Sequence, residues 1–210
     1  MAFRMEINSE NIKIACVGWL RFRKRLQLIA TECGRWSSDV LACDDKDSVE
    51  IEVKVDKYDL RRDFDKRKHK AYEDGTARGW TPKYFYFAVP YDLMDEALLI
   101  IKNKGPKYGL MVFEPREVYQ IFECLRVVKR PTKLHDGAIA KRMQRDVAYR
   151  MGSELFNLYA HKEYFFKEIR SIYNHASKKI VNDLAKARTD LEMDDGGFCE
   201  EEHACRAVQN

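Results

Sequence analysis

The 210 residues are 45% hydrophobic and 34% charged, a balance that suits one sizeable core beneath a strongly solvated surface. No apolar run approaches the ~18 residues that a membrane span needs. The first 26 residues show no secretory pattern. Composition therefore argues against an integral membrane protein or a secreted protein, and we expect a cytoplasmic location.

The formal net charge of +4 conceals a gradient along the chain. Residues 190–210 hold seven acidic residues and one basic residue, whereas residues 1–189 carry a net charge of +10. A basic body suits a nucleic-acid partner, because phosphate contacts supply most of the non-specific affinity. A solvated surface with a disordered acidic tail explains the same charges about as well.

Six cysteines are spaced irregularly, without a CxxC pair, so we expect reduced thiols, several of them in the core. The tail carries Cys199, His203 and Cys205, which are residue types that bind metals. It lacks the paired short spacings of zinc sites, so we do not expect a metal there.

The first part of the chain alternates between helical and strand-like periodicity. Helices are expected over 9–24, where Ser9 can cap the first turn, and over 57–73 and 91–103. Strands are expected over 26–33, 36–43, 48–55, 83–89 and 105–114, and residues 115–130 predict a short helix followed by the strand LRVVK. Gly34 separates the first two strands, and the hairpin turn DDKDS separates the second and third. This order predicts an α/β fold, with a mixed sheet flanked by helices.

Beyond Pro131 the pattern becomes helical. Residues 136–190 contain no proline, and their apolar residues recur at helical spacing. We expect two or more helices that pack on the body or on a second subunit. The predicted organisation is a core over residues 1–130, a helical extension over 131–190, and an acidic, disordered tail over 191–210.

Two carboxylates and an ammonium group are predicted to share one patch of the sheet. Glu52 and Lys54 are two residues apart on a strand, so their side chains point the same way. The hairpin turn places Asp39 across from Glu52, within about one residue of register. Two carboxylates suit Mg²⁺ or Mn²⁺, which takes its remaining ligands from water and phosphate. Such an ion can polarise a phosphodiester and activate a water molecule, while Lys54 neutralises developing charge.

Alternating Glu and Lys on an exposed strand face is common, so this spacing alone is a weak signal. Asp39, however, lies in an apolar strand, SDVLA, where a role in solubility is not expected. The helix that follows is basic, because residues 54–70 contain eight Lys or Arg and four Asp. The order of elements around the three residues is αβββαβ.

In this order, the segments SDVLA, EIEVKV and YFYFAVP make the chain resemble the PD-(D/E)XK nuclease superfamily. Within it, the chain is similar to the MmcB-type group of DNA-repair endonucleases over roughly residues 10–130. The resemblance implies a restriction-endonuclease-like core and a metal-dependent DNA endonuclease, in DNA repair, restriction or phage DNA processing. It further implies that Asp39, Glu52 and the carbonyl of Val53 bind Mg²⁺ or Mn²⁺, with Lys54 assisting. Ser38 replaces the proline of the motif.

Other residues have two interpretations. Glu32 matches an acidic position and is either an accessory metal ligand or an exposed edge-strand charge. Glu50 shares the face of Glu52 and either reaches the metal or is solvated. Lys68 and Tyr72 match a helical spacing of the superfamily, where Lys68 contacts phosphate or is solvated and Tyr72 packs in the core. The candidate phosphate contacts are Lys57, Arg61, Arg62 and Lys68.

Two other functions compete with nuclease activity. One is a nuclease-like module that binds DNA without cleaving it. The other is an interaction protein, for instance a phage-type inhibitor, that acts mainly through its helical C-terminus. DNA is the favoured partner, RNA stays open, and the C-terminal helices are candidates for forming a homodimer.

Overall fold

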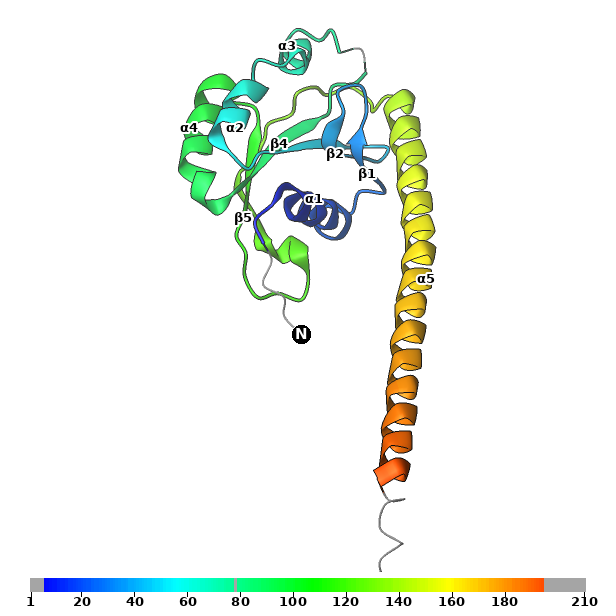
Figure 1. Ribbon diagram of the computed structural model, residues 1–210. Coiled ribbons are helices and arrows are strands. Elements are labelled where there is room, and N and C mark those ends of the chain that lie inside the picture. The colour runs from blue at the N-terminus through cyan, green and yellow to red at the C-terminus, as the bar shows by residue number, and fades with distance from the viewer. Residues whose placement is uncertain (1–5, 78, 195–210) are drawn as a thin grey trace, which may run out of the picture. The chain divides into compact units, whose positions relative to one another are not determined.

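The computed structural model describes residues 6–77 and 79–194, and the chain divides into two compact units, residues 1–155 and 156–210. The first unit is built on a six-stranded mixed sheet whose strands follow one another in chain order (Figure 1). The strands are β1 (Leu28–Cys33), β2 (Ser38–Cys43), β3 (Ser48–Val53), β4 (Tyr84–Pro90), β5 (Gly109–Phe113) and β6 (Leu125–Lys129). Strands β1 to β3 form an antiparallel meander, β3 to β5 run parallel, and β6 returns antiparallel.

Helices cover both faces of this sheet. Helix α1 (Ser9–Gly18) continues into the π-helical turn η1 (Trp19–Arg23), and both pack on one face. The other face is covered by α2 (Lys57–Asp63), α3 (Arg67–Glu73) and α4 (Met94–Lys104). Two short 3₁₀ turns, η2 (Tyr91–Leu93) and η3 (Ile121–Cys124), complete the connections. The predicted α/β fold with a mixed sheet flanked by helices is therefore confirmed.

The alternation along β3 divides its side chains between the two faces. Val49, Ile51 and Val53 lie in the core beneath α1. Glu50 and Glu52 point to the opposite face, as expected for a period of two. That face is not solvated, however, because α3 lies over it and buries both carboxylates.

The helix expected over residues 57–73 is two helices, with a break between Asp63 and Arg67. An unbroken helix turns about 100° per residue, so Lys68 and Tyr72 would lie about 80° and 120° away from the buried Leu60. The break occurs at Lys66, which adopts an extended conformation. The second helix can therefore bury Lys68 and Tyr72 against the sheet.

The C-terminal region is one continuous helix, α5 (Lys141–Asp194), and the expectation of two or more helices is wrong. Its first turns belong to the compact body, which therefore extends beyond residue 130. Glu154 accepts hydrogen bonds from the backbone N–H of Thr31 (2.9 Å) and from its hydroxyl (2.7 Å), and Arg150 donates to the Thr31 carbonyl (3.0 Å). These contacts satisfy backbone groups of the edge strand β1, which would otherwise invite pairing with another chain.

Some predictions fall outside the described residues. Cys199, His203, Cys205 and residues 195–210 of the predicted tail are among them, while residues 191–194 belong to α5. The other four cysteines, Cys16, Cys33, Cys43 and Cys124, are free thiols in the core, as expected. Among the helices that the structure describes, none combines the length and the apolar character needed to cross a membrane.

Candidate functional site

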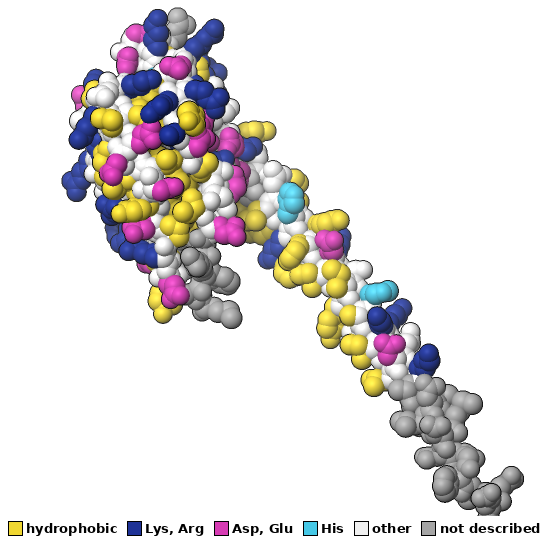
Figure 2. All heavy atoms as spheres, turned by 60° about the vertical axis from the view of Figure 1, so that its left-hand side comes forward, with side chains coloured by type: hydrophobic (Ala, Val, Ile, Leu, Met, Phe, Trp, Pro, Cys, Tyr) yellow, Lys and Arg dark blue, Asp and Glu magenta, His cyan; other side chains and the backbone are white. Residues whose placement is uncertain are grey.

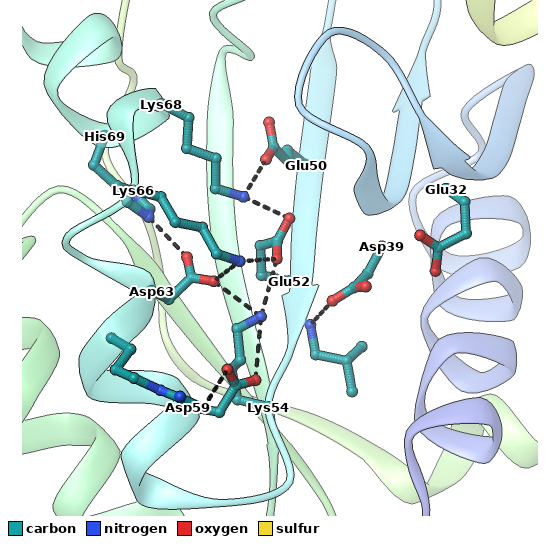
Figure 3. A network of polar contacts seen from close by, with 12 residues as sticks. Glu32, Asp39, Glu50, Glu52, Lys54, Asp59, Asp63, Lys66, Lys68 and His69 are labelled. Atoms are coloured by element: carbon teal, nitrogen blue, oxygen red, sulfur yellow. Dashed lines mark hydrogen bonds and ion pairs between the residues drawn. The ribbon is translucent and has the colours of Figure 1, made fainter.

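The structure brings together the three residues that the sequence singles out. Val40 pairs with Ile51 across β2 and β3, so the register places Asp39 opposite Glu52. The backbone N–H of Val53 donates to Asp39 Oδ2 at 2.8 Å, and Lys54 Nζ donates to Glu52 Oε2 at 3.1 Å (Figure 3). The predicted register is thus confirmed, and all three side chains lie at the carboxyl end of β3.

Lys54 is held in place by acidic groups from the strand and from α2. Only 5% of this residue is exposed, and its ammonium nitrogen lies 2.9 Å from Asp63 Oδ2 and 3.7 Å from Asp59 Oδ2. Burial alone would lower the pKa of Lys54, but the charges of Glu52 and Asp63 outweigh it and raise that pKa. Lys54 therefore stays a cation at neutral pH.

Asp63 is the centre of the network, although no motif or spacing predicted this role. Its side chain is fully buried, and it accepts contacts from His69 Nε2 (2.8 Å) and Lys66 Nζ (2.5 Å) besides that of Lys54. His69 Nδ1 in turn lies 2.9 Å from the Tyr108 hydroxyl. Burial opposes ionisation of Asp63, but the His69 hydrogen bond and the nearby lysine charges hold its pKa well below the ordinary value.

Glu50 and Lys68 are buried partners, which corrects the expectation that either is solvated. Glu50 is 1% exposed and accepts hydrogen bonds from Lys68 Nζ (3.0 Å) and the Tyr72 hydroxyl (2.7 Å). Lys68 is 2% exposed, and its ammonium nitrogen also lies 2.5 Å from Glu52 Oε1. A side chain this deeply buried does not reach a phosphate group, so its role is to neutralise the two glutamates. Tyr72 packs in the core, as expected.

Asp39 lies at the open side of the network, where it is 19% exposed. Burial and the like charge of Glu52 raise its pKa, while the hydrogen bond from Val53 opposes this shift. Lys13 of α1 lies 3.9 Å from Asp39 Oδ1 and 2.6 Å from Glu32 Oε1. Glu32 is therefore linked to Asp39 through Lys13, a residue that sequence reasoning missed.

The carboxylates of this centre are of the type that binds a divalent ion. Asp39 and Glu52 provide hard carboxylate oxygens. Their negative charges repel each other, and a bound cation would relieve this repulsion. The buried Glu52 Oε1 accepts no hydrogen bond of good geometry, even though the Lys68 ammonium is close to it. Among the described residues, no group of three or more His, Cys, Asp or Glu side chains is arranged to hold a metal. The two carboxylates fit an ion that takes its other ligands from backbone carbonyl, water and phosphate.

The other candidate phosphate contacts lie on α2 and differ in their availability. Arg61 is paired with Glu96 of α4. Arg62 is 77% exposed and lies only loosely beside Asp59, at 3.7 Å. Lys57 extends over the Tyr58 ring, 5.3 Å from its centroid. Arg62 is therefore the most exposed cation of this group, while Lys57 is partly buried and forms no ion pair with any other residue that the structure describes.

No protein-family model matches the chain, and no curated protein matches it. The nuclease interpretation therefore depends on Asp39, Glu52 and Lys54 themselves, on the elements that carry them, and on the charges around them. These observations describe a buried, charge-balanced centre at one end of a mixed sheet, with an acidic group at its open side.

Proposed function

We propose that this chain is a metal-dependent DNA endonuclease with a PD-(D/E)XK-type centre formed by Asp39, Glu52 and Lys54. The observation that carries the proposal is the meeting of these three side chains across β2 and β3, with Val53 N–H fixing Asp39 and Glu52 contacting Lys54. The order of elements supports it, because α1, three antiparallel strands, α2 with α3, and the parallel β4 follow the order of a restriction-endonuclease-like core.

The proposed chemistry is hydrolysis of a phosphodiester by water. Asp39, Glu52 and the Val53 carbonyl would hold one Mg²⁺ or Mn²⁺, which supplies polarisation of the phosphate and a water of lowered pKa. Lys54 stays protonated beside Glu52 and Asp63, so it can neutralise charge that develops on the phosphate oxygens. Asp63 and Asp59 position that ammonium group from α2.

DNA would approach the open side of the centre. Asp39, Asp59 and Lys66 are more exposed than the other members of the network, at 19%, 42% and 50%, and the Lys66 ammonium lies 3.9 Å from Glu52 Oε2. Lys66, Arg62 and Lys57 would then contact backbone phosphates on either side of the scissile bond. Arg61 and Lys68 are not included, because each is already paired with a glutamate.

A nuclease-like module that binds DNA without cleaving it is the second candidate. Lys54, Lys66 and Lys68 all lie within 4.0 Å of Glu52, so this carboxylate is neutralised by the protein itself. A neutralised carboxylate competes less well for a divalent ion, which favours binding over catalysis. Metal-dependent cleavage therefore separates the two candidates.

We also propose that α5 forms a homodimer. From Leu158 to Leu184, large apolar side chains lie along one side of this helix, at intervals that fit its 3.6-residue turn (Figure 2). These side chains are Leu158, Phe165, Phe166, Ile169, Ile172, Tyr173, Ile180 and Leu184, and each is more than 40% exposed. The stripe is about 40 Å long, which is unusual for a helix in water and typical of a helix that pairs with another. A second copy offers the same stripe, and two copies bring two centres to the two strands of DNA.

The experiment that tests the function is a cleavage panel. The purified chain is incubated with single-stranded, duplex and branched DNA, and with RNA, each with Mg²⁺, with Mn²⁺ or with EDTA. The proposal expects cleavage of at least one DNA substrate that depends on the divalent ion and that Lys54→Ala abolishes. Binding to DNA without any cleavage would favour the second candidate.

A further inference from the structure

A pocket of about 520 Å³ lies on the face of the sheet that α1 covers, away from the candidate centre. Its walls come from η1, from the turn before β3, from the first residues of β3 and β4, and from the end of β6. The candidate centre lies at the other end of β3 and on the other face, since Glu52 contacts α3 and Lys54 contacts α2. The pocket is therefore a separate site, and its volume lies within the range of about 300–1,000 Å³ that small-molecule sites occupy.

The inner wall of the pocket is aromatic and rigid. The ring of Trp19 meets that of Tyr86 edge to face, with 5.9 Å between centroids, and both residues are almost fully buried. Burial raises the pKa of Tyr86 to about 12, so its hydroxyl stays protonated. Tyr86 packs directly on Gly109, where an added Cβ would lie only 2.5 Å from the ring. Tyr84 adds a third, partly exposed ring.

The rim of the pocket is cationic. Lys24 and Arg130 line it, both are exposed, and neither takes part in an ion pair with any other residue that the structure describes. Asp47 is the single carboxylate among the lining residues. The pocket thus combines flat apolar walls, two cations and one acceptor, which is a poor site for a lipid chain or a cation.

The backbone beside the pocket is irregular, and this irregularity brings the cationic Lys24 next to the aromatic Trp19. In the π-helical turn, the N–H of Lys24 donates to the carbonyl of Trp19, five residues back, at 3.0 Å. This wider turn places Lys24 above Trp19, with its ammonium 5.2 Å from the centroid of the indole. The following Arg25 has φ of 62°, a left-handed conformation that a residue with a side chain rarely adopts. Irregularities of these two kinds are frequent at functional sites.

We propose that this pocket binds the 5′-phosphorylated nucleoside unit, either as a free mononucleotide or as the 5′ end of a strand. The base packs against Trp19 and Tyr86, and the phosphate lies between Lys24 and Arg130 at the rim. Asp47 accepts a hydrogen bond from an amino group of the base or from a sugar hydroxyl. The proposal does not depend on nuclease activity, because no residue of the candidate centre lines the pocket.

Calorimetric titration of the full chain tests this site. The probes are AMP, dTMP, adenosine, inorganic phosphate, and a short oligodeoxynucleotide with and without a 5′ phosphate. We expect saturable binding of the mononucleotides, with adenosine and inorganic phosphate each at least about tenfold weaker, because the base and the phosphate contribute separately. A higher affinity of the phosphorylated oligonucleotide than of the mononucleotides would identify a strand end as the ligand.

Variants locate the site. The double variant Lys24→Ser/Arg130→Ser changes only exposed side chains, so it should fold, and we expect it to weaken AMP binding about tenfold or more. Lys102→Ser, on the exposed part of α4, is the matched control and should bind as the parent chain does. Trp19→Phe should weaken binding while keeping an apolar wall.

The proposal is overturned if no phosphorylated probe binds, if inorganic phosphate binds as well as AMP, or if the double variant binds AMP unchanged. Asp39→Asn distinguishes a failure of the nucleotide-pocket proposal from a failure of the nuclease proposal, because this variant should abolish cleavage and leave AMP binding intact.

Discussion

At the scale of residues, the candidate centre is built around opposite charges that balance one another, all of them buried except the half-exposed Lys66. Glu50, Glu52 and Asp63 are matched by Lys54, Lys66 and Lys68, with contacts of 2.5 to 3.1 Å for the closest pairs. Such a set adds less stability than its number of contacts suggests, because each ion loses its hydration. Removing one member is costly, because it leaves the others buried without a partner.

Asp63 and Asp59 provide a matched test of this balance, since both lie on α2 and both face Lys54. Asp63 is fully buried and 2.9 Å from the ammonium nitrogen, whereas Asp59 is 42% exposed and 3.7 Å away. We expect Asp63→Ala to lower the free energy of unfolding by about 3–5 kcal/mol, and Asp59→Ala to lower it by less than about 1 kcal/mol. Urea denaturation measures both values. Equal losses would contradict the central role of Asp63.

The depressed pKa of Asp63 also determines how the free energy of unfolding should depend on pH. Because the pKa of Asp63 is depressed in the folded chain, the unfolded chain takes up the proton first as pH falls. The stability that Asp63 provides is therefore complete above its unfolded pKa of about 4 and is lost as pH falls below that value. Urea denaturation between about pH 3 and pH 6 should show a steeper loss in the parent chain than in Asp63→Asn. Parallel pH profiles would contradict the depressed pKa.

At the scale of elements, the sheet was easier to predict than the helices. The alternation in β3 and the short hairpin turn determine which side chains share a face and which residues pair, so Asp39 could be placed opposite Glu52. The break between α2 and α3 has no local signal such as a proline. It follows from the pairing of Lys68 with Glu50, which are distant in sequence. For the same reason, Glu50, Lys68 and Asp63 each resemble a solvated charge until their partners are known.

Glycine positions test the packing of these elements. A Cβ at Gly109 would lie 2.5 Å from the Tyr86 ring and 3.0 Å from the Lys129 carbonyl oxygen, so Gly109→Ala should destabilise the fold by about 1–3 kcal/mol. Gly152 lies within α5, and beyond the backbone of the helix itself no described atom lies within 4 Å of an added Cβ, so Gly152→Ala should stabilise the chain by about 0.5–1 kcal/mol. Thermal unfolding monitored by circular dichroism compares the two. A stable Gly109→Ala variant would show that the ring of Tyr86 is free to move.

At the scale of the whole molecule, the long helix differs most from what was expected. The helical character of residues 136–190 could be predicted from their periodicity, whereas the number of helices could not, because the same periodicity suits one long helix or several shorter ones. The expected boundary after residue 130 differs from the structure because the first turns of α5 complete the edge of β1.

If the apolar stripe of α5 pairs two copies of the chain, the protein should be a dimer in solution. Sedimentation equilibrium should give about twice the chain mass of 24.8 kDa. Ile169→Glu, in the middle of the stripe, should shift the protein toward monomer. Ser171→Glu is the control, because it lies about 200° around the helix from Ile169. A monomeric parent chain, or equal effects of the two variants, would contradict the proposed dimer.

If Asp39 serves catalysis and not folding, its substitution should stop cleavage without lowering stability. Cleavage of the preferred DNA substrate with Mg²⁺ or Mn²⁺ is measured for the parent chain, for Asp39→Asn and for Asp45→Asn, an exposed acid in the turn between β2 and β3. Because burial and Glu52 raise the pKa of Asp39, its charge opposes folding at neutral pH. We therefore predict that Asp39→Asn loses at least about 100-fold in cleavage rate while its unfolding temperature is unchanged or higher, and that Asp45→Asn keeps both. Full cleavage by folded Asp39→Asn would show that Asp39 is not a catalytic residue.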